Sequence, residues 1–173
     1  GYILSIYPFT FVIVSLIIPK ILQYYTKKQV FIVGSIMYAL SVIAFGLIIY
    51  TNSEVFLILA FSLRSIQGAS NAAVYTTAYS VFSMLYEGHD IMKINSYFKS
   101  TLGIGLVIGL LLGTLLFMLG GYTLPFIIFG LFFLLYIPIV VEYFPNKLND
   151  SISDIHAIKE TEHDIEMYNL SHD

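Results

Sequence analysis

Three polar side chains occur close together in an otherwise apolar part of the chain. Arg64, Gln67 and Asn71 lie in the stretch LRSIQGASNAAVYTTAYS, residues 63–80. In a helix that rises about 1.5 Å per residue, Arg64 lies roughly 15 Å from Glu54. A guanidinium at that depth in a bilayer costs roughly 2.5–3.5 kcal/mol, so such residues usually face a bundle interior or a water-filled cavity. A positive charge there can lower the pKa of a nearby carboxyl group.

The polar residues share one helical face, which we call the polar stripe. Its positions follow the i, i+3, i+4, i+7 spacing of a helix. They are Arg64, Gln67, Gly68, Asn71, Tyr75, Ala78 and Tyr79. Two interpretations are open: a buried hydrogen-bond cluster that holds helices together, or the lining of a path for a solute. We favour the second because Arg64 places a charge near the middle of the segment.

The composition indicates a membrane protein. Of the 173 residues, 58% are hydrophobic and 11% are charged, which is too apolar for a soluble domain of this length. A hydrocarbon core about 30 Å thick requires roughly 20 residues of apolar helix, and an open sheet cannot cross it because its edges would be unpaired. The qualifying stretches are residues 1–19, 30–50, 55–84, 100–119 and 122–141. The predicted fold class is an all-α integral membrane protein, a multi-pass bundle of about five transmembrane helices over residues 1–142.

The lysines indicate which loops face the cytoplasm. They follow the first, third and fifth stretches, at Lys20, Lys27, Lys28, Lys93, Lys99 and Lys147. By the positive-inside bias those loops are cytoplasmic, although simple anchoring of the topology also explains the lysines of the first loop. The chain would then have an odd number of spans, with its first residue on the outer side of the membrane. This is the topology expected if one further helix precedes it. The composition of residues 143–173 predicts an acidic cytoplasmic tail or the start of a central loop.

The fourth stretch carries regularly spaced glycines. Gly105, Gly109 and Gly113 are four residues apart and share one helical face. Small residues at this spacing let a neighbouring helix approach closely. A dinucleotide-binding loop would need a shorter spacing and a preceding strand. We therefore predict a helix-packing face.

Few residues suggest other chemistry. The chain has no cysteine and no hydrolase or metalloprotease signature, so neither enzymatic activity nor a cofactor is predicted. His156, Glu160 and His163 could share a helical face as metal ligands, but chance explains this tail pattern better, so no metal site is predicted. No basic patch beyond the loop lysines suggests nucleic acid as a partner.

Three segments, in this order, resemble the major facilitator superfamily of transporters: PKILQYYTKKQV, LRSIQGASNAAVYTTAYS and GIGLVIGLLLGTLLFMLGGYTLPFIIFG. Residues 1 to about 145 are similar to the second to sixth helices of the N-terminal half, above all in the drug:proton antiporters and vesicular amine transporters. The resemblance implies a fragment of a secondary transporter that moves a small drug-like or amine-like solute by proton-coupled alternating access. The implied partners are membrane lipid, the solute, protons and the missing helices, in a plasma or vesicle membrane.

The resemblance also assigns roles to individual residues. The R-x-x-Q-G pattern of the fourth family helix is intact at Arg64, Gln67 and Gly68. This implies that Arg64 takes part in proton coupling or organises the carboxylate that does so. The family's conformational-latch loop keeps its basic pair at Lys27 and Lys28. Its other motif positions hold different residues here, namely Pro19, Gln23, Tyr24 and Thr26.

Other positions follow the family in part. The glycines of the antiporter pattern in the fifth family helix are kept at residues 105, 109 and 113, while Leu110 replaces its proline. The implied substrate-side residues are Asn71, Tyr75 and Tyr79, because tyrosine offers a cation an aromatic face and a hydroxyl group. The alternative function is a non-transporting membrane scaffold or assembly subunit, in which the polar stripe only joins helices.

Overall fold

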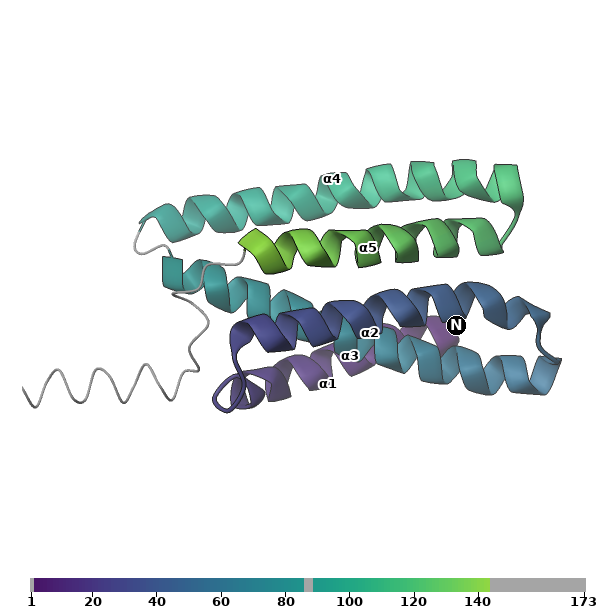
Figure 1. The fold of residues 1–173 in the computed structure, drawn as a ribbon, viewed down its shortest axis with the longest axis horizontal. Helices are drawn as coiled ribbons and strands as arrows, with labels where there is room; N and C mark the ends of the chain where they lie inside the picture. The colour runs from purple at the N-terminus through teal and green to yellow at the C-terminus, as the bar shows by residue number, and fades with distance from the viewer. Residues whose placement is uncertain (1, 86–88, 144–173) are drawn as a thin grey trace, which may run out of the picture.

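The computed structural model describes residues 2–85 and 89–143, which form five α-helices and one short 3-10 helix (Figure 1). The α-helices are α1 (Tyr2–Ile21), α2 (Lys27–Leu47), α3 (Ser53–Leu85), α4 (His89–Gly120) and α5 (Thr123–Tyr143), and the 3-10 helix η1 (Ile48–Tyr50) follows α2. No strand occurs within the described ranges, so the prediction of an all-α fold class is confirmed. The predicted acidic tail lies outside the described residues from position 144 onward.

Among the described residues, four helical segments are long and apolar enough to cross a bilayer: α1, α2 with η1, α4 from Met92, and α5. The helix α3 is not among them, although its 33 residues would extend about 50 Å, beyond a hydrocarbon core of about 30 Å. The polar stripe lowers its apolar character. The four apolar segments support an integral membrane protein, and a fifth span formed by α3 remains a prediction.

Local sequence signals explain several helix ends. Thr26 caps the start of α2, where its Oγ1 accepts a hydrogen bond from the Gln29 backbone N–H at 3.4 Å. Gly121 ends α4 with φ of +70°, a conformation that side chains with a Cβ rarely adopt, and its N–H donates to the Phe117 carbonyl at 2.8 Å. The start of α4 is earlier than the expected span, at His89, because polar residues before position 100 continue the helix outside its apolar part.

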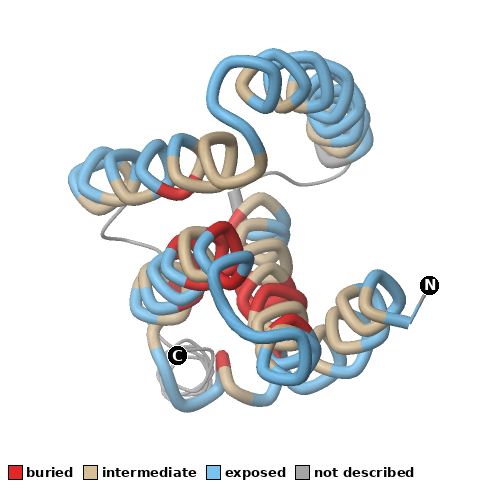
Figure 2. Tube along the Cα trace, turned by 90° about the vertical axis from the view of Figure 1, so that its right-hand side faces the viewer, coloured by how far each residue is buried: buried red, intermediate tan, exposed pale blue. Residues whose placement is uncertain are grey.

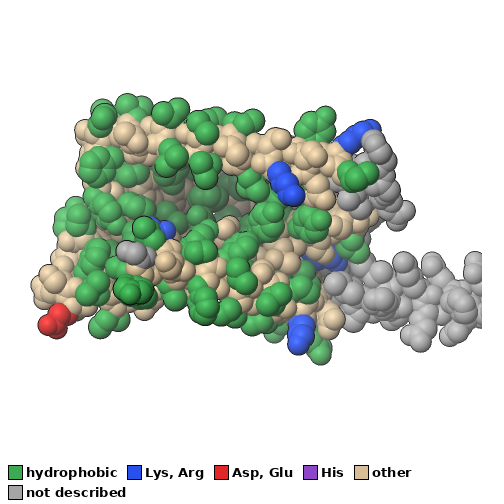
Figure 3. Space-filling model, turned by 180° about the vertical axis from the view of Figure 1, so that it is seen from behind, with side chains coloured by type: hydrophobic (Ala, Val, Ile, Leu, Met, Phe, Trp, Pro, Cys, Tyr) green, Lys and Arg blue, Asp and Glu red, His purple; other side chains and the backbone are tan. Residues whose placement is uncertain are grey.

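The helices form two groups. The helix α3 packs against both α1 and α2, while α5 packs against α2 and pairs with α4 (Figures 1 and 2). The helix α4 touches α3 only sparsely, and its apolar segment buries none of its residues in the described structure. On the face shown in Figure 3, the surface is hollowed between the α4–α5 pair and the other helices. The polar stripe therefore lies on the helix that packs against both α1 and α2 and has a sparse contact with α4.

In the part of the chain that the structure describes, buried apolar side chains form two small clusters among α1, α2 and α3. Ile18, Leu22 and Ala73 pack together near the α1–α2 loop, and Phe45, Ile48 and Ala60 pack near the α2–α3 turn. Figure 2 shows that the buried residues concentrate where α2 and α3 meet. This packing fixes the rotation of α3 about its own axis. That rotation sets the direction in which each side chain of the polar stripe points.

Candidate functional site

A hydrogen-bonded chain of polar groups connects α3 to α2. Arg64 Nη1 donates to Gln67 Oε1 at 3.1 Å, across one turn of α3. Gln67 Nε2 in turn donates to the backbone carbonyl oxygen of Ser41 on α2 at 3.1 Å, and Gln67 is only 3% exposed. The side-chain amide of Gln67 thus accepts a hydrogen bond from Arg64 within α3 and donates one to α2.

The guanidinium of Arg64 is half-buried and also contacts an aromatic ring. Its Cζ lies 4.2 Å from the centroid of the Phe45 ring on α2, a distance typical of a cation–π interaction. Its Nε is buried and has no hydrogen-bond partner within the described residues. Gln67 and Phe45 therefore both contact the guanidinium, while its Nε is left without a hydrogen-bond partner among the described residues.

Asn71 connects α3 to α1. Its Nδ2 donates to the hydroxyl of Tyr7 at 2.6 Å, and both residues are half-buried. Sequence reasoning missed Tyr7, and the signal that could have found it is a tyrosine beside Pro8 in an otherwise apolar span. Because Gln67 bonds to α2 and Asn71 to α1, these two residues of the polar stripe join three helices.

Tyr75 and Tyr79 lie further along α3, where Tyr75 contacts both α1 and α4 and Tyr79 contacts α4. The Tyr75 ring lies 5.9 Å from the Phe11 ring of α1 and 5.4 Å from the Phe98 ring of α4, measured between centroids. Phe82 adds a fourth ring, 5.5 Å from Phe98. We call Phe11, Tyr75, Phe82 and Phe98 the aromatic cluster. The hydroxyl of Tyr79 accepts a hydrogen bond from Asn95 Nδ2 of α4 at 3.3 Å.

Gly68 marks the closest approach of α3 to α1. A Cβ atom added at this position would overlap the carbonyl oxygen of Tyr7 and lie 3.2 Å from Thr10 Cβ and 3.3 Å from the backbone nitrogen of Phe11. Only a residue without a side chain lets the two backbones come this close. Gly68 therefore sets the spacing that places Asn71 within reach of Tyr7.

The predicted glycine face of α4 is open in the described structure. A Cβ added at Gly105 or Gly109 would meet nothing within 4 Å, and one at Gly113 would meet only Phe129 Cε2 at 3.9 Å. The packing of another helix there remains a prediction. Sequence reasoning instead missed Gly46 and Gly130, where α2 and α5 meet closely, because a lone glycine has no spacing pattern that reveals its partner.

The predicted latch residues lie at the start of α2. Lys27 is fully buried and Lys28 is half-buried, directly after the cap residue Thr26. The two lysines are therefore not equivalent, since of the two only Lys28 is accessible to a lipid or to another protein.

Comparison with known proteins identifies the family. The family model of the Major Facilitator Superfamily matches residues 1–161. The human MFS-type transporter SLC18B1 is 25% identical over 151 residues, which cover 87% of this chain and 33% of that protein. The mouse protein of the same name is 27% identical over 152 residues, with the same two coverages.

The matches also define how much of a family member is present. The chain spans about one third of the length of the curated relatives it matches. No solved structure gives a significant match. The family match over residues 1–161 confirms the resemblance seen in the three sequence segments, and the chain belongs to the major facilitator superfamily.

Proposed function

We propose that this chain is part of a secondary transporter that moves a small organic solute across a membrane by alternating access. Its five helices would correspond to the second to sixth helices of the family's N-terminal half. The observation that carries the proposal is Arg64, a half-buried cation on the least apolar helix, with one buried donor unpartnered within the described residues. A charge inside a membrane protein is costly and usually serves function.

In this proposal Arg64 acts on the pKa of a carboxyl group supplied from outside the polar stripe. The stripe itself contains no Asp or Glu. A cation within about 4–6 Å lowers the pKa of a carboxyl group by roughly 1–3 units, so a carboxyl group that approaches Arg64 in one state and leaves it in the other binds and releases a proton. Proton coupling would use the positive charge of Arg64 in this way. The acidic tail would then face the cytoplasm, in a plasma or vesicle membrane.

The aromatic cluster is the proposed substrate side. Tyr75 contacts rings on both α1 and α4, and Tyr79 and Asn71 add polar groups along the same face of α3. Aromatic faces attract organic cations, and hydroxyl and amide groups can bind an amine or its hydrating water. A drug-like or amine-like cation is the class of solute that this combination suits.

The test is uptake by the full-length transporter that contains this sequence. Proteoliposomes with an imposed pH gradient would be assayed with the fluorescent cation ethidium as the probe. We expect Arg64→Ala to abolish coupled accumulation at an unchanged protein level, because the charge is lost. Ser65→Ala is the matched control, since the Ser65 hydroxyl bonds only to the Phe61 carbonyl of its own helix. Wild-type accumulation in Arg64→Ala would remove Arg64 from the mechanism.

A second function is supported by a specific observation. The bonds from Gln67 to α2 and from Asn71 to α1 serve to hold helices together, which a membrane scaffold or assembly subunit would also need. Because the chain has no cysteine, a single cysteine at position 71 or 75 can be probed cleanly. Reaction with a membrane-impermeant thiol reagent supports a solute path, whereas protection supports the scaffold.

A further inference from the structure

A row of aromatic rings leads from Arg64 to α5. The Phe45 ring of α2 lies beside the guanidinium, with its centroid 4.2 Å from Arg64 Cζ. The Phe126 ring of α5 lies 5.4 Å from the Phe45 ring, and the Tyr122 ring lies 4.9 Å from the Phe126 ring, measured between centroids. At such separations aromatic rings attract one another and attract cations. The row therefore connects the charge on α3 to a helix that carries none of the polar stripe.

The position of Phe126 depends on a close approach of α5 to α2. A Cβ atom added at Gly46, the residue after Phe45, would lie 2.6 Å from Phe126 Cβ and 3.4 Å from the backbone oxygen of Thr123. Gly46 therefore lets α5 come near enough for the two phenylalanine rings to touch. The Phe45 side chain has little room to turn there, since only 6% of it is exposed.

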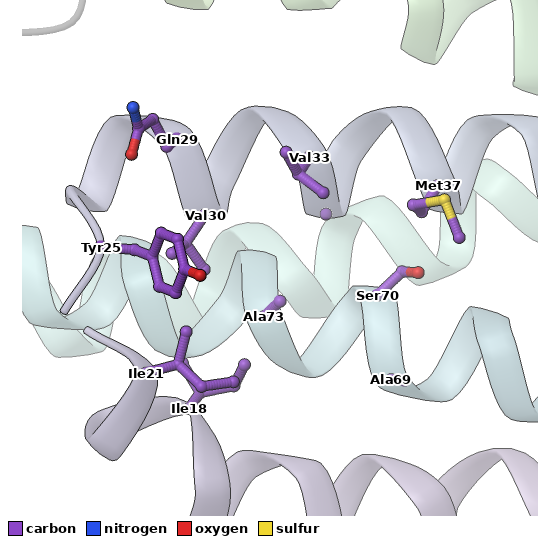
Figure 4. A pocket seen from close by; sticks show the side chains of 11 residues that line it. Ile18, Ile21, Tyr25, Gln29, Val30, Val33, Met37, Ala69, Ser70 and Ala73 are labelled. Atoms are coloured by element: carbon purple, nitrogen blue, oxygen red, sulfur yellow. The ribbon is translucent and has the colours of Figure 1, made fainter. Parts of the chain in front are cut away.

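The packing is looser elsewhere along α2. Nearer the α1–α2 loop a pocket opens between the helices, and its lining includes Met37 of α2 and Ser70 of α3 (Figure 4). Phe45 lies about two turns beyond Met37, roughly 12 Å along the helix, where its neighbour Ala60 of α3 is fully buried. The Phe45 ring is therefore in the closed part of the bundle, where removing a neighbour leaves a gap that the ring can move into.

We infer that Phe126 is a positioning residue for Arg64 and acts through the ring of Phe45. Gln67 holds one side of the guanidinium by a hydrogen bond, and the Phe45 ring provides the face against which the group rests. Removing the Phe126 ring lets Phe45 turn away, so the guanidinium loses that face but keeps its charge and its bond to Gln67. The positioning can be measured without transport, and only its consequence for uptake rests on the proposed function.

Arg64 is the only arginine in the sequence, which allows a direct test. The chain is produced with ¹⁵N-labelled arginine and studied by NMR in detergent micelles, where it gives one backbone N–H signal and one Nε–H signal. A proton that lies over an aromatic ring is shifted upfield by the ring current. The Nε–H signal therefore reports the contact with Phe45, and the backbone signal reports α3 itself. Phe45→Leu gives the reference spectrum of a guanidinium without the ring.

Phe133→Leu is the matched control for Phe126→Leu. Phe133 also lies on α5 and packs against an aromatic ring of α2, that of Tyr38, at 5.2 Å between centroids. The control thus removes the same kind of contact between the same two helices. Phe126→Tyr keeps the ring, and Phe126→Met removes the ring but keeps most of the volume, so it replaces Phe126→Leu if that variant does not fold.

We expect Phe126→Leu to move the Nε–H signal towards its position in Phe45→Leu. The ratio of ring-bound to released guanidinium should fall about two- to twelvefold, which corresponds to the usual strength of an aromatic pair. The backbone signal should stay in place, Phe133→Leu and Phe126→Tyr should keep the wild-type spectrum, and Phe126→Leu should add nothing in a Phe45→Leu background. An Nε–H signal that does not respond to loss of the Phe126 ring would overturn the inference, as would an equal shift in Phe133→Leu.

Uptake by the full-length transporter separates this inference from the proposed function. If both are correct, Phe126→Leu lowers coupled accumulation of ethidium and Phe133→Leu does not. A shifted Nε–H signal with unchanged accumulation supports the positioning of Arg64 by Phe126 and counts against a role of Arg64 in coupling.

Discussion

Replacing Gly68 with alanine adds one methyl group at the point where α3 crosses α1. The new carbon would overlap the carbonyl oxygen of Tyr7 and approach the backbone nitrogen of Phe11 to 3.3 Å. Both are backbone atoms, so they cannot rotate away and α1 must move. Inserting a methyl group into a packed contact costs about 1–3 kcal/mol. Alanine returns about 1 kcal/mol through its better helix propensity, which leaves a net loss of up to about 2 kcal/mol.

Gly105→Ala provides the matched control. A Cβ at position 105 meets nothing within 4 Å, so only the gain in helix propensity acts there. The same chemical change is therefore expected to have opposite signs at the two positions. For a chain of 173 residues, a loss of up to about 2 kcal/mol at position 68 corresponds to a fall in Tm of up to about 8 °C.

The assay is thermal unfolding of the purified chain in detergent micelles, followed by the far-ultraviolet circular dichroism of its helices. Reversibility is checked by a second scan of the same sample. If Gly68→Ala unfolds at the same temperature as Gly105→Ala, or above it, the close approach of α3 to α1 is refuted.

Three further changes test the polar and aromatic contacts of α3 through the free energy of unfolding in mixed detergent. A double-mutant cycle of Asn71→Ala and Tyr7→Phe should give a coupling energy of about 0.6–1.7 kcal/mol for the 2.6 Å hydrogen bond, whereas simple additivity would argue against that bond. Phe45→Leu should lower stability by about 0.5–2 kcal/mol through loss of the ring beside Arg64, and the loss should shrink in an Arg64→Met background if the cation is responsible. Thr77→Val replaces a buried hydroxyl that has no partner among the described residues, so it should raise stability by about 1–3 kcal/mol, and a decrease would show that the hydroxyl is bonded after all.

The helices themselves were largely predictable, because apolar runs of sufficient length leave the backbone of a membrane protein few alternatives. The positions at which the helices begin and end were less predictable. The start of α4 at His89 precedes the expected position 100, since hydropathy marks where a chain can enter lipid and not where its helical hydrogen bonds begin. The polar stripe lowered the apolar character of α3, so the helix that matters most for the candidate site gives the weakest membrane signal.

For the contacts of the candidate site, the sequence predicted the residues on α3 but not their partners on other helices. The spacing of Arg64, Gln67 and Asn71 identified the helix face that carries the polar groups. Their partners could not be found this way, because the backbone oxygen of Ser41 is 26 residues from Gln67 in the sequence and Tyr7 is 64 residues from Asn71. The aromatic cluster was missed for the same reason, since its rings come from α1, α3 and α4.

The sequence alone therefore determined that the chain is helical, belongs in a membrane and carries a polar face on one helix, because composition and periodicity act within a single segment. Only the tertiary structure decided what that face meets: α2 through Gln67, α1 through Asn71 and Gly68, and α4 through the aromatic cluster. It also decided that, among the described residues, Gly105 and Gly109 of α4 have no close neighbour while Gly46 and Gly130 are packed. The physical reason is that packing depends on the rotation and distance of neighbouring helices, which no periodicity within one helix can encode.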